Sequence, residues 1–335
     1  MMRIGVVVIG RNEGERLKRC LESAMVSTER VVYVDSGSTD GSVEFAKSIG
    51  VEVVDLDTSI AFTAARARNE GVARLIERWG DVEAVHMIDG DCTFVEGWIE
   101  TASVFLEDHP KAAVVCGRRR ERFPGASRYN RLCDLEWDTP IGVAKSCGGD
   151  AMFRLDAFND AGGYRSSLIA GEEPELCVRI RAGGWTVHRL DHEMTLHDAA
   201  MTRFSQFWQR AKRAGHAYAE GAVIHGRGVD KHGVKQTRSA IVWGFVFPIV
   251  GLALAWWTFG ISVLAVLGLY GAQGLRIRAM SLRQGRSKED ATLLAIFTML
   301  AKPAQAMGWL LYWRRRVFKQ QATLIEYKGA GGNDG

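Results

Sequence analysis

The sequence predicts an α/β protein with a mostly parallel mixed sheet, followed by C-terminal helices that associate with a membrane. Three observations indicate this. Short β-branched runs alternate with helix-like stretches over residues 1–116. The pair Asp89-Gly90-Asp91 ends one of these runs, and the segment 239–274 contains no charged residue. A charge-free segment of that length exceeds the roughly 20 residues of one membrane span.

The alternation of the first 116 residues predicts the order of the elements. Strands are expected at 4–9, 31–34, 51–56, 84–88 and 112–116. Helices are expected between them, at 13–25, 39–49, 63–79 and 95–106. Continuous β-branched strands separated by helices are typical of a parallel sheet covered on both faces. From residue 117 to about 230 the pattern is less regular.

Composition excludes several classes of protein. An apolar content of 47% and a charged content of 24% are those of a globular protein, and the net charge of +4 indicates no nucleic-acid partner. The six cysteines lack Cys-x-x-Cys spacing, so we expect reduced thiols rather than a disulfide framework or a zinc site. The chain enters a strand directly after its first residues, so we expect no signal peptide and a cytoplasmic α/β region.

The charge-free segment predicts a membrane hairpin. Two short helices, at 240–257 and 261–275, would flank an aromatic turn at 256–260. The alternative is a helix pair buried inside a soluble protein. Basic residues precede and follow the segment, which places both flanks on the cytoplasmic side: Lys231, Lys235 and Arg238 before it, and Arg276, Arg278, Arg283, Arg286 and Lys288 after it.

A third apolar stretch, 291–313, follows the hairpin and contains Pro303. It either lies in the membrane interface or crosses the membrane with a kink, and the sequence leaves both open. The basic cluster Arg314–Arg316 closes this stretch and can bind anionic lipid headgroups.

Asp89-Gly90-Asp91 is the strongest functional signal. It follows the run 84–88, so it lies at the carboxyl end of a buried strand, where open α/β sheets bind ligands. Two carboxylates beside a tight glycine turn can hold a hard divalent cation, which substrate phosphates usually complete. The motif therefore indicates a nucleotide bound through a metal.

Five motifs in order extend this signal. They are Ile9-Gly10-Arg11-Asn12-Glu13, Val34 to Gly41, Ala65 to Gly71, Asp89-Gly90-Asp91, and Gly171 to Leu176. Together they resemble the family-2 glycosyltransferases over about residues 3–220. The resemblance implies a GT-A type, Rossmann-like nucleotide-binding domain. It also implies a hexosyltransferase-like, inverting enzyme that uses a nucleotide-sugar donor such as a UDP- or GDP-sugar.

The resemblance also implies a donor-binding set. Asp35 would accept from the nucleobase, or else only cap its turn. Arg68 would meet the base or the diphosphate, or else be an exposed helix residue. The remaining positions would cradle the nucleoside, the ribose, and the donor sugar or acceptor: Ile9, Arg11, Glu13, Asp89 and Asp150.

The metal implied by the resemblance is Mg²⁺ or Mn²⁺. Asp91 would ligate it directly, Asp89 would approach it, and His197 would provide a third ligand or else be a structural histidine. The ion would neutralise charge on the departing nucleoside diphosphate.

An inverting transfer needs a general base for the acceptor hydroxyl. Glu173 stands where the family has an aspartate, so it is the first candidate. Because glutamate is one methylene longer, Glu172 and Glu175 remain alternatives. Acids that merely begin a helix are the other interpretation, above all for Glu175.

The expected protein is a membrane-associated glycosyltransferase of glycan or polysaccharide biosynthesis, at the inner or plasma membrane, with a lipid-linked or glycan acceptor and membrane lipids as partners. Its expected parts are a catalytic domain at 1–230, with a donor half at 1–116 and an acceptor half at 117–230, the hairpin at 239–275, and an amphipathic or membrane helix at 290–320 with a basic tail. A non-catalytic nucleotide-binding scaffold on the same fold is the alternative. The donor sugar, nucleobase and acceptor stay open.

Overall fold

A computed structural model describes residues 2–320, and the chain divides into two compact units. Unit 1 contains the described residues up to Phe123 together with Glu136–Ala200. Unit 2 contains Pro124–Leu135 and the described residues from Met201 onward. Each unit is described by itself below.

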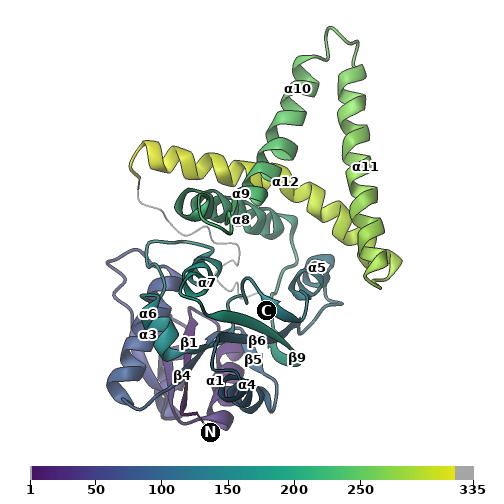
Figure 1. Cartoon of the computed structure of the whole chain (residues 1–335). Coiled ribbons are helices and arrows are strands. Elements are labelled where there is room, and N and C mark those ends of the chain that lie inside the picture. The colour runs from purple at the N-terminus through teal and green to yellow at the C-terminus, as the bar shows by residue number, and fades with distance from the viewer. Residues whose placement is uncertain (1, 321–335) are drawn as a thin grey trace. The chain divides into compact units, whose positions relative to one another are not determined.

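The first half of unit 1 confirms the predicted parallel sheet (Figure 1). Four parallel strands lie in the order β3-β2-β1-β4. They are β1 (Ile4–Gly10), β2 (Val31–Asp35), β3 (Glu52–Asp55) and β4 (Ala84–Asp89). The connecting helices are α1 (Glu15–Ser27), α2 (Ser42–Ser48) and α3 (Ala64–Arg78). Every predicted element is present here, with ends that shift by a few residues.

The second half of unit 1 completes a nine-stranded sheet within the described residues. The order continues β4-β8-β6-β9-β5, and β7 pairs with β9. The strands are β5 (Cys92–Phe94), β6 (Ala112–Glu121), β7 (Gly142–Ala144), β8 (Ala151–Arg154) and β9 (Thr186–His197). The helices that end in or lie within this unit are α4 (Trp98–Asp108), α5 (Arg128–Trp137), α6 (Leu155–Asp160) and α7 (Glu172–Ala182). Because β8 runs antiparallel to both β4 and β6, the sheet is mixed.

Strand β1 lies between β2 and β4 and is buried on both faces. Helix α3 lies so close to it that a Cβ on Gly71 would stand 2.4 Å from the Val7 side chain. A glycine is therefore required for this close approach. The packing fixes β1, β2 and β4 with their carboxyl ends at one edge, where the candidate site lies.

Unit 2 is helical. Helices α8 (Phe204–His225) and α12 (Lys288–Val317) cross at two glycines. A Cβ on Gly215 would overlap the backbone of Gln305, and one on Gly308 would overlap the carbonyl of Lys212. Small residues thus allow the two backbones to meet.

The hairpin of unit 2 differs from its prediction in its boundaries. Its first arm runs through α9 (Val234–Ile241), a π-helical turn η1 (Val242–Val246) and α10 (Phe247–Ala253), so it begins and ends earlier than 240–257. The turn spans 254–260, and the second arm, α11 (Ile261–Arg283), extends past the predicted end at 275 (Figure 1). The second arm is longer because a helix continues through arginines as easily as through leucines.

The surface of this hairpin is apolar and exposed. Leu252, Trp256 and Phe259 are 69%, 86% and 97% exposed. Ser262 Oγ donates to the Gly251 carbonyl at 2.7 Å, which holds the two arms together. The alternative of a pair buried in a soluble core is therefore wrong within the described part of unit 2.

Two helical stretches among residues 2–320 are long and apolar enough to cross a membrane, Val234–Ala253 and Lys288–Val317. The second contains Pro303 inside one continuous helix. Of the most apolar 18-residue stretch of this helix, 44% is buried inside the structure. The helix therefore also fits one that packs against α8. These two helices indicate membrane association weakly, and they leave the two interpretations of 291–313 open.

Candidate active site

Three strand ends bring Asp91, His197 and Glu121 together. Strand β5 pairs with β9 so that Cys92 lies opposite His197, which places the preceding Asp91 beside that ring. Strand β6 pairs with β9 so that Glu121 also lies opposite His197. His197 Nε2 is 3.4 Å from Asp91 Oδ2, and His197 Nδ1 is 3.8 Å from Glu121 Oε2. All three side chains are buried.

Asp91 and His197 form, with the adjacent Cys92, a cluster that fits a divalent metal. Asp91, Cys92 and His197 each offer a ligand atom, and these atoms lie within 4.8 Å of one another. Carboxylate oxygens suit Mg²⁺ and Mn²⁺, and imidazole suits other transition-metal ions. Glu121 stands behind the imidazole, in the position of a group that orients a metal-binding histidine. The ring of Trp137 packs edge-on against His197 at 4.6 Å.

Asp89 lies outside that cluster and takes part in a second arrangement. Five alternating charges, here called the charged chain, run Glu172, Arg68, Asp89, Arg119 and Asp150. Arg68 donates to Glu172 and to Asp89, each at 2.7 Å. Arg119 is 2.7 Å from Asp150 and 3.9 Å from Asp89. The charged chain joins α7, α3, β4 and β6.

The arginines of the charged chain are buried yet stay charged. Burial by itself would lower the pKa of the Arg68 guanidinium, but Asp89 and Glu172 raise it, and the net shift is upward. The same balance, with Asp150 as the strongest partner, raises the pKa of Arg119. Arg68 is thus a buried bridge and not the exposed helix residue of the alternative interpretation.

Gly149 lies next to the charged chain, and its lack of a side chain leaves room for Asp89 and the two arginines. A Cβ on Gly149 would stand 3.0 Å from Asp89 Oδ2 and 3.3 Å from Arg68 Nη2. We expect Gly149→Val to lower donor affinity at least tenfold, because the branched side chain displaces Asp89 and both arginines. Isothermal titration with the nucleotide measures it, and Gly125→Val, in open surroundings, is the matched control.

Glu173 has different surroundings. Its Oε1 accepts from the Cys147 backbone N–H at 2.7 Å and from the thiols of Cys147 and Cys177 at 2.9 Å each. Within residues 2–320 it has no arginine or lysine partner. Burial raises its pKa, and the hydrogen bonds from Cys147 partly oppose that shift. A carboxylate of raised pKa is a stronger base.

The two alternative bases are held by arginines. Glu172 bonds Arg68, as above. Glu175 is buried and accepts from Arg179 at 2.7 Å and from Arg165 at 3.3 Å. Glu175 therefore anchors α7 and is not a solvated acid at a helix start.

The two loops predicted to hold the nucleoside are tied together. Asn12 donates its backbone N–H to Ser38 Oγ at 2.9 Å, and its side-chain oxygen accepts from Thr39 N–H at 2.8 Å. Asn12 has a φ of 54°, which asparagine tolerates better than most residues.

Asp35 sits in the turn after β2. It accepts from the N–H groups of Gly37 and Ser38 at 2.8 Å each and from the Tyr33 hydroxyl at 2.7 Å. This geometry fits a turn aspartate, and its contact with a nucleobase stays a prediction. The other predicted residues of the first loop differ in exposure: Ile9 is buried, Arg11 is exposed, and Glu13 pairs with Arg16 at 2.8 Å.

The residues that sequence reasoning missed are Arg119, Glu121, Cys147 and Cys177. A signal existed for Arg119, because side chains alternate along a strand. Arg118 and Arg120 pair with Asp191 and Glu193 on one face of β6, and Arg119 points to the other. Nothing in the sequence pairs Cys147 with Cys177.

Known proteins resemble this chain in sequence and in fold. Residues 5–157 match the family model "Glycosyl transferase family 2". Glycosyltransferase AglE of Haloferax volcanii is 25% identical over 199 residues, which cover 55% of this chain and 63% of that protein. The glucosyl-dolichyl phosphate glucuronosyltransferase of the same organism is 25% identical over 240 residues, which cover 62% of this chain and 75% of that protein. The chain spans between 33% and 66% of the length of the first three curated relatives that it matches.

Among solved structures, the mannosyltransferase PcManGT of Pyrobaculum calidifontis, in complex with GDP-Man and Mn²⁺, has a TM-score of 0.56 at 18% identity. The match covers 91% of this chain and 87% of that one, and it shows a shared fold. Residues 5–157 thus match glycosyltransferase family 2, and the chain shares the GT-A fold.

Proposed function

We propose that this chain moves a sugar, with inversion, from a UDP- or GDP-linked donor to a hydroxyl or phosphate of a lipid-linked acceptor at the cytoplasmic face of a membrane. The proposed sugar transfer rests on one observation. Asp91 and His197 lie together at an edge of the sheet, and β4 ends at the same edge, where Asp89 bonds Arg68 of the charged chain. Anionic ligand sites at the carboxyl edge of such sheets are general.

Each residue then has one task. Asp91 and His197 hold the divalent ion, Mn²⁺ or Mg²⁺, which when bound neutralises the diphosphate. Arg68 keeps Asp89 in a fixed rotamer through its 2.7 Å bond, and Asp150 does the same for Arg119. Loop residues Arg11 and Asp35 face the nucleoside.

Glu173 takes the proton of the acceptor group. Because burial raises its pKa and its Oε1 already accepts three hydrogen bonds, the opposite oxygen, Oε2, is the atom we assign to the proton. The acceptor oxygen then attacks the anomeric carbon as the bond to the nucleoside diphosphate breaks.

Two similar proteins support the substrate classes. PcManGT is in complex with GDP-Man and Mn²⁺, which favours a nucleotide sugar and a divalent ion here. A dolichyl-phosphate-linked sugar is named for one relative, which favours a lipid-linked acceptor. The proposed parts are a catalytic domain at 1–230, the hairpin at 239–275 and the helix at 290–320.

The donor site is tested by thermal shift with UDP and GDP sugars, with and without Mn²⁺. We expect one nucleotide to raise the Tm of the wild type only when Mn²⁺ is present. Asp91→Ala and His197→Ala should each lose that response, because each variant removes one ligand of the ion. Asp81→Ala, which changes an exposed acid before the amino end of β4, is the control. A folded wild type that responds to no nucleotide would instead favour the non-catalytic scaffold.

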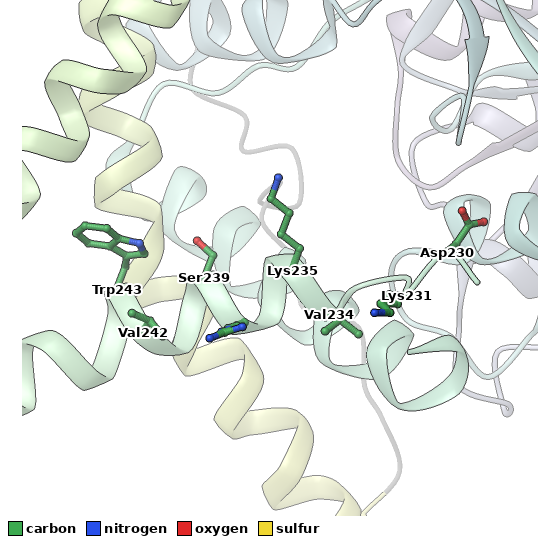
Figure 2. A pocket seen from close by; sticks show the side chains of 8 residues that line it. Asp230, Lys231, Val234, Lys235, Ser239, Val242 and Trp243 are labelled. Carbon is green, nitrogen blue, oxygen red and sulfur yellow. The ribbon is translucent and has the colours of Figure 1, made fainter. Parts of the chain in front are cut away.

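A basic pocket in unit 2 supports contact with anionic lipid. It lies at the start of the first hairpin arm and is lined by Asp230, Lys231, Val234, Lys235, Arg238, Ser239, Val242 and Trp243. Figure 2 shows Lys235 and Ser239 on successive turns of α9, with Trp243 one turn further. Lys231, Lys235 and Arg238 are exposed. Basic side chains next to an apolar helix each add about 1 kcal/mol of attraction to an anionic leaflet.

We expect the triple change of Lys231, Lys235 and Arg238 to Glu to reduce binding to vesicles with anionic lipid at least tenfold, because three charges at the membrane surface are reversed. Co-sedimentation measures the binding. The same change at three exposed basic residues of unit 1, Lys47, Arg78 and Lys111, is the matched control. Equal loss in both variants would show that net charge alone matters and would remove the support of the basic pocket.

A further inference from the structure

A second group of possible metal ligands lies around Glu173. Cys147, Glu173 and Cys177 each offer one atom, and these atoms lie within 4.8 Å of one another. The two thiol sulfurs are 4.0 Å apart, and each is 2.9 Å from Glu173 Oε1. We call these three residues the thiol–carboxylate cluster.

The spacing of the three atoms is close to that of a zinc site. With Zn–S bonds of about 2.3 Å and a Zn–O bond of about 2.0 Å, tetrahedral geometry places the sulfurs about 3.8 Å apart and each sulfur about 3.5 Å from the oxygen. The observed sulfur separation of 4.0 Å already matches. Only the carboxylate oxygen, at 2.9 Å, has to retreat by roughly half an ångström.

The backbone holds the three ligands in place. Glu173 and Cys177 are four residues apart on α7, so they lie on one face of that helix. Cys147 comes from the segment between β7 and β8, and its N–H fixes the carboxylate at 2.7 Å. Glu173 and Cys177 are buried, and Cys147 is partly exposed, so an ion has access past Cys147.

We propose that the thiol–carboxylate cluster is a second metal site, for a thiophilic ion such as Zn²⁺, and that the ion blocks transfer by occupying Glu173. Binding forms two Zn–S bonds and one Zn–O bond, and the two thiol protons leave to solvent. A water completes the fourth position. Thiolates select Zn²⁺ over Mg²⁺ and Mn²⁺, so the two thiols of the thiol–carboxylate cluster favour Zn²⁺ more strongly than the single thiol of Cys92 does in the first cluster.

The inhibitory part rests on the proposed role of Glu173 as the base, and the binding part does not. A carboxylate bound to Zn²⁺ cannot take up the acceptor's proton. Zinc would thus act as an inhibitor that does not compete with the nucleotide sugar.

Binding is tested on the purified full chain with Zn²⁺ and with Co²⁺ as a spectroscopic probe. We expect the wild type to bind one more Zn²⁺ than Cys147→Ser/Cys177→Ser and to show a thiolate-to-cobalt absorption band that the double variant lacks. Cys133→Ala, which changes another buried cysteine, should bind like the wild type. Cys147→Ala serves if the double variant does not fold, and its Zn²⁺ affinity should fall at least tenfold.

Equal zinc stoichiometry and an equal cobalt band in wild type and variants would overturn the site. So would a wild type that lacks two free thiols under reducing conditions, because a disulfide between Cys147 and Cys177 would then occupy the cluster.

Inhibition is tested separately, at saturating Mn²⁺. Zinc should reduce transfer by the wild type and by Cys133→Ala at least tenfold, and a chelator should restore it. Residual transfer by the cysteine variants should be insensitive to zinc. Equal inhibition of these variants would place the inhibitory ion elsewhere and overturn that part. A chain without transfer activity that still shows the cobalt band would contradict the proposed function and leave the metal site standing.

Discussion

Replacing Glu173 with glutamine is expected to lower the rate of sugar transfer by about 10²–10⁴-fold, the usual contribution of a positioned general base. The amide has nearly the same shape and can still accept from Cys147 and Cys177, but it cannot take a proton from the acceptor. Because Glu173 is assigned to the transferred proton and not to the donor, the KM for the nucleotide sugar should stay unchanged. Steady-state rates with saturating acceptor measure both quantities.

Two neighbouring glutamates provide matched comparisons on the same helix. Glu172→Gln weakens the bond to Arg68, so it should raise the donor's KM more than it lowers kcat. Glu175→Gln weakens the bonds to Arg165 and Arg179, so it should lower the Tm and affect the rate little. If Glu172→Gln abolishes kcat and Glu173→Gln does not, Glu172 is the base.

The pH dependence of kcat provides a second signature of the same residue. Burial raises the pKa of Glu173 above 4.5, the value of an ordinary glutamate. A base is active when deprotonated, so the rate should fall as the pH drops through this raised pKa, at a higher pH than for an exposed carboxylate. The Glu173→Gln variant should lose this acid limb. A limb that persists in the variant belongs to another group.

Sequence patterns predicted the first half of the fold because local signals there agree with the final packing. The strands 4–9, 31–34 and 84–88 are apolar runs whose central position buries both faces. The sequence alone therefore places the residues at their carboxyl ends, Asp35 and Asp89, at one edge of the sheet. The same logic located Asp91, because one residue separates it from Asp89.

The rest of the site depends on pairings that have no local signal. Strand β5 has three residues, too few for any periodicity, yet its register against β9 determines that Asp91 meets His197. Cys147 lies in an irregular segment, and its contact with Cys177 arises only when α7 packs beside it. Arg68 and Glu172 are 104 residues apart, so their bond shows how α3 and α7 are locked together.

Because of that bond, loss of Arg68 should lower the stability strongly. Its side chain is 3% exposed and neutralises Asp89 and Glu172 at 2.7 Å each. Arg68→Met keeps the volume of the stem but removes the arginine partner of Glu172 and leaves Asp89 with the more distant Arg119, at 3.9 Å. Removing one partner of a buried ion pair costs about 3–5 kcal/mol, and we expect the lower end, because Asp89 remains 31% exposed to water. Chemical denaturation of the purified protein measures the loss.

Two variants decide whether the lost ion pairs of Arg68 cause the loss of stability. Arg68→Lys keeps the positive charge but presents one ammonium where the guanidinium spans two carboxylates, so its stability should fall between wild type and Arg68→Met. Arg74→Met removes an arginine from the exposed face of the same helix, where it pairs with Glu52 and Glu77, and should leave the denaturation midpoint nearly unchanged. Equal losses for Arg68→Met and Arg74→Met would mean that α3 is sensitive to any arginine loss. If Arg68→Met is as stable as the wild type but binds the donor more weakly, the charged chain contributes to substrate binding and not to stability.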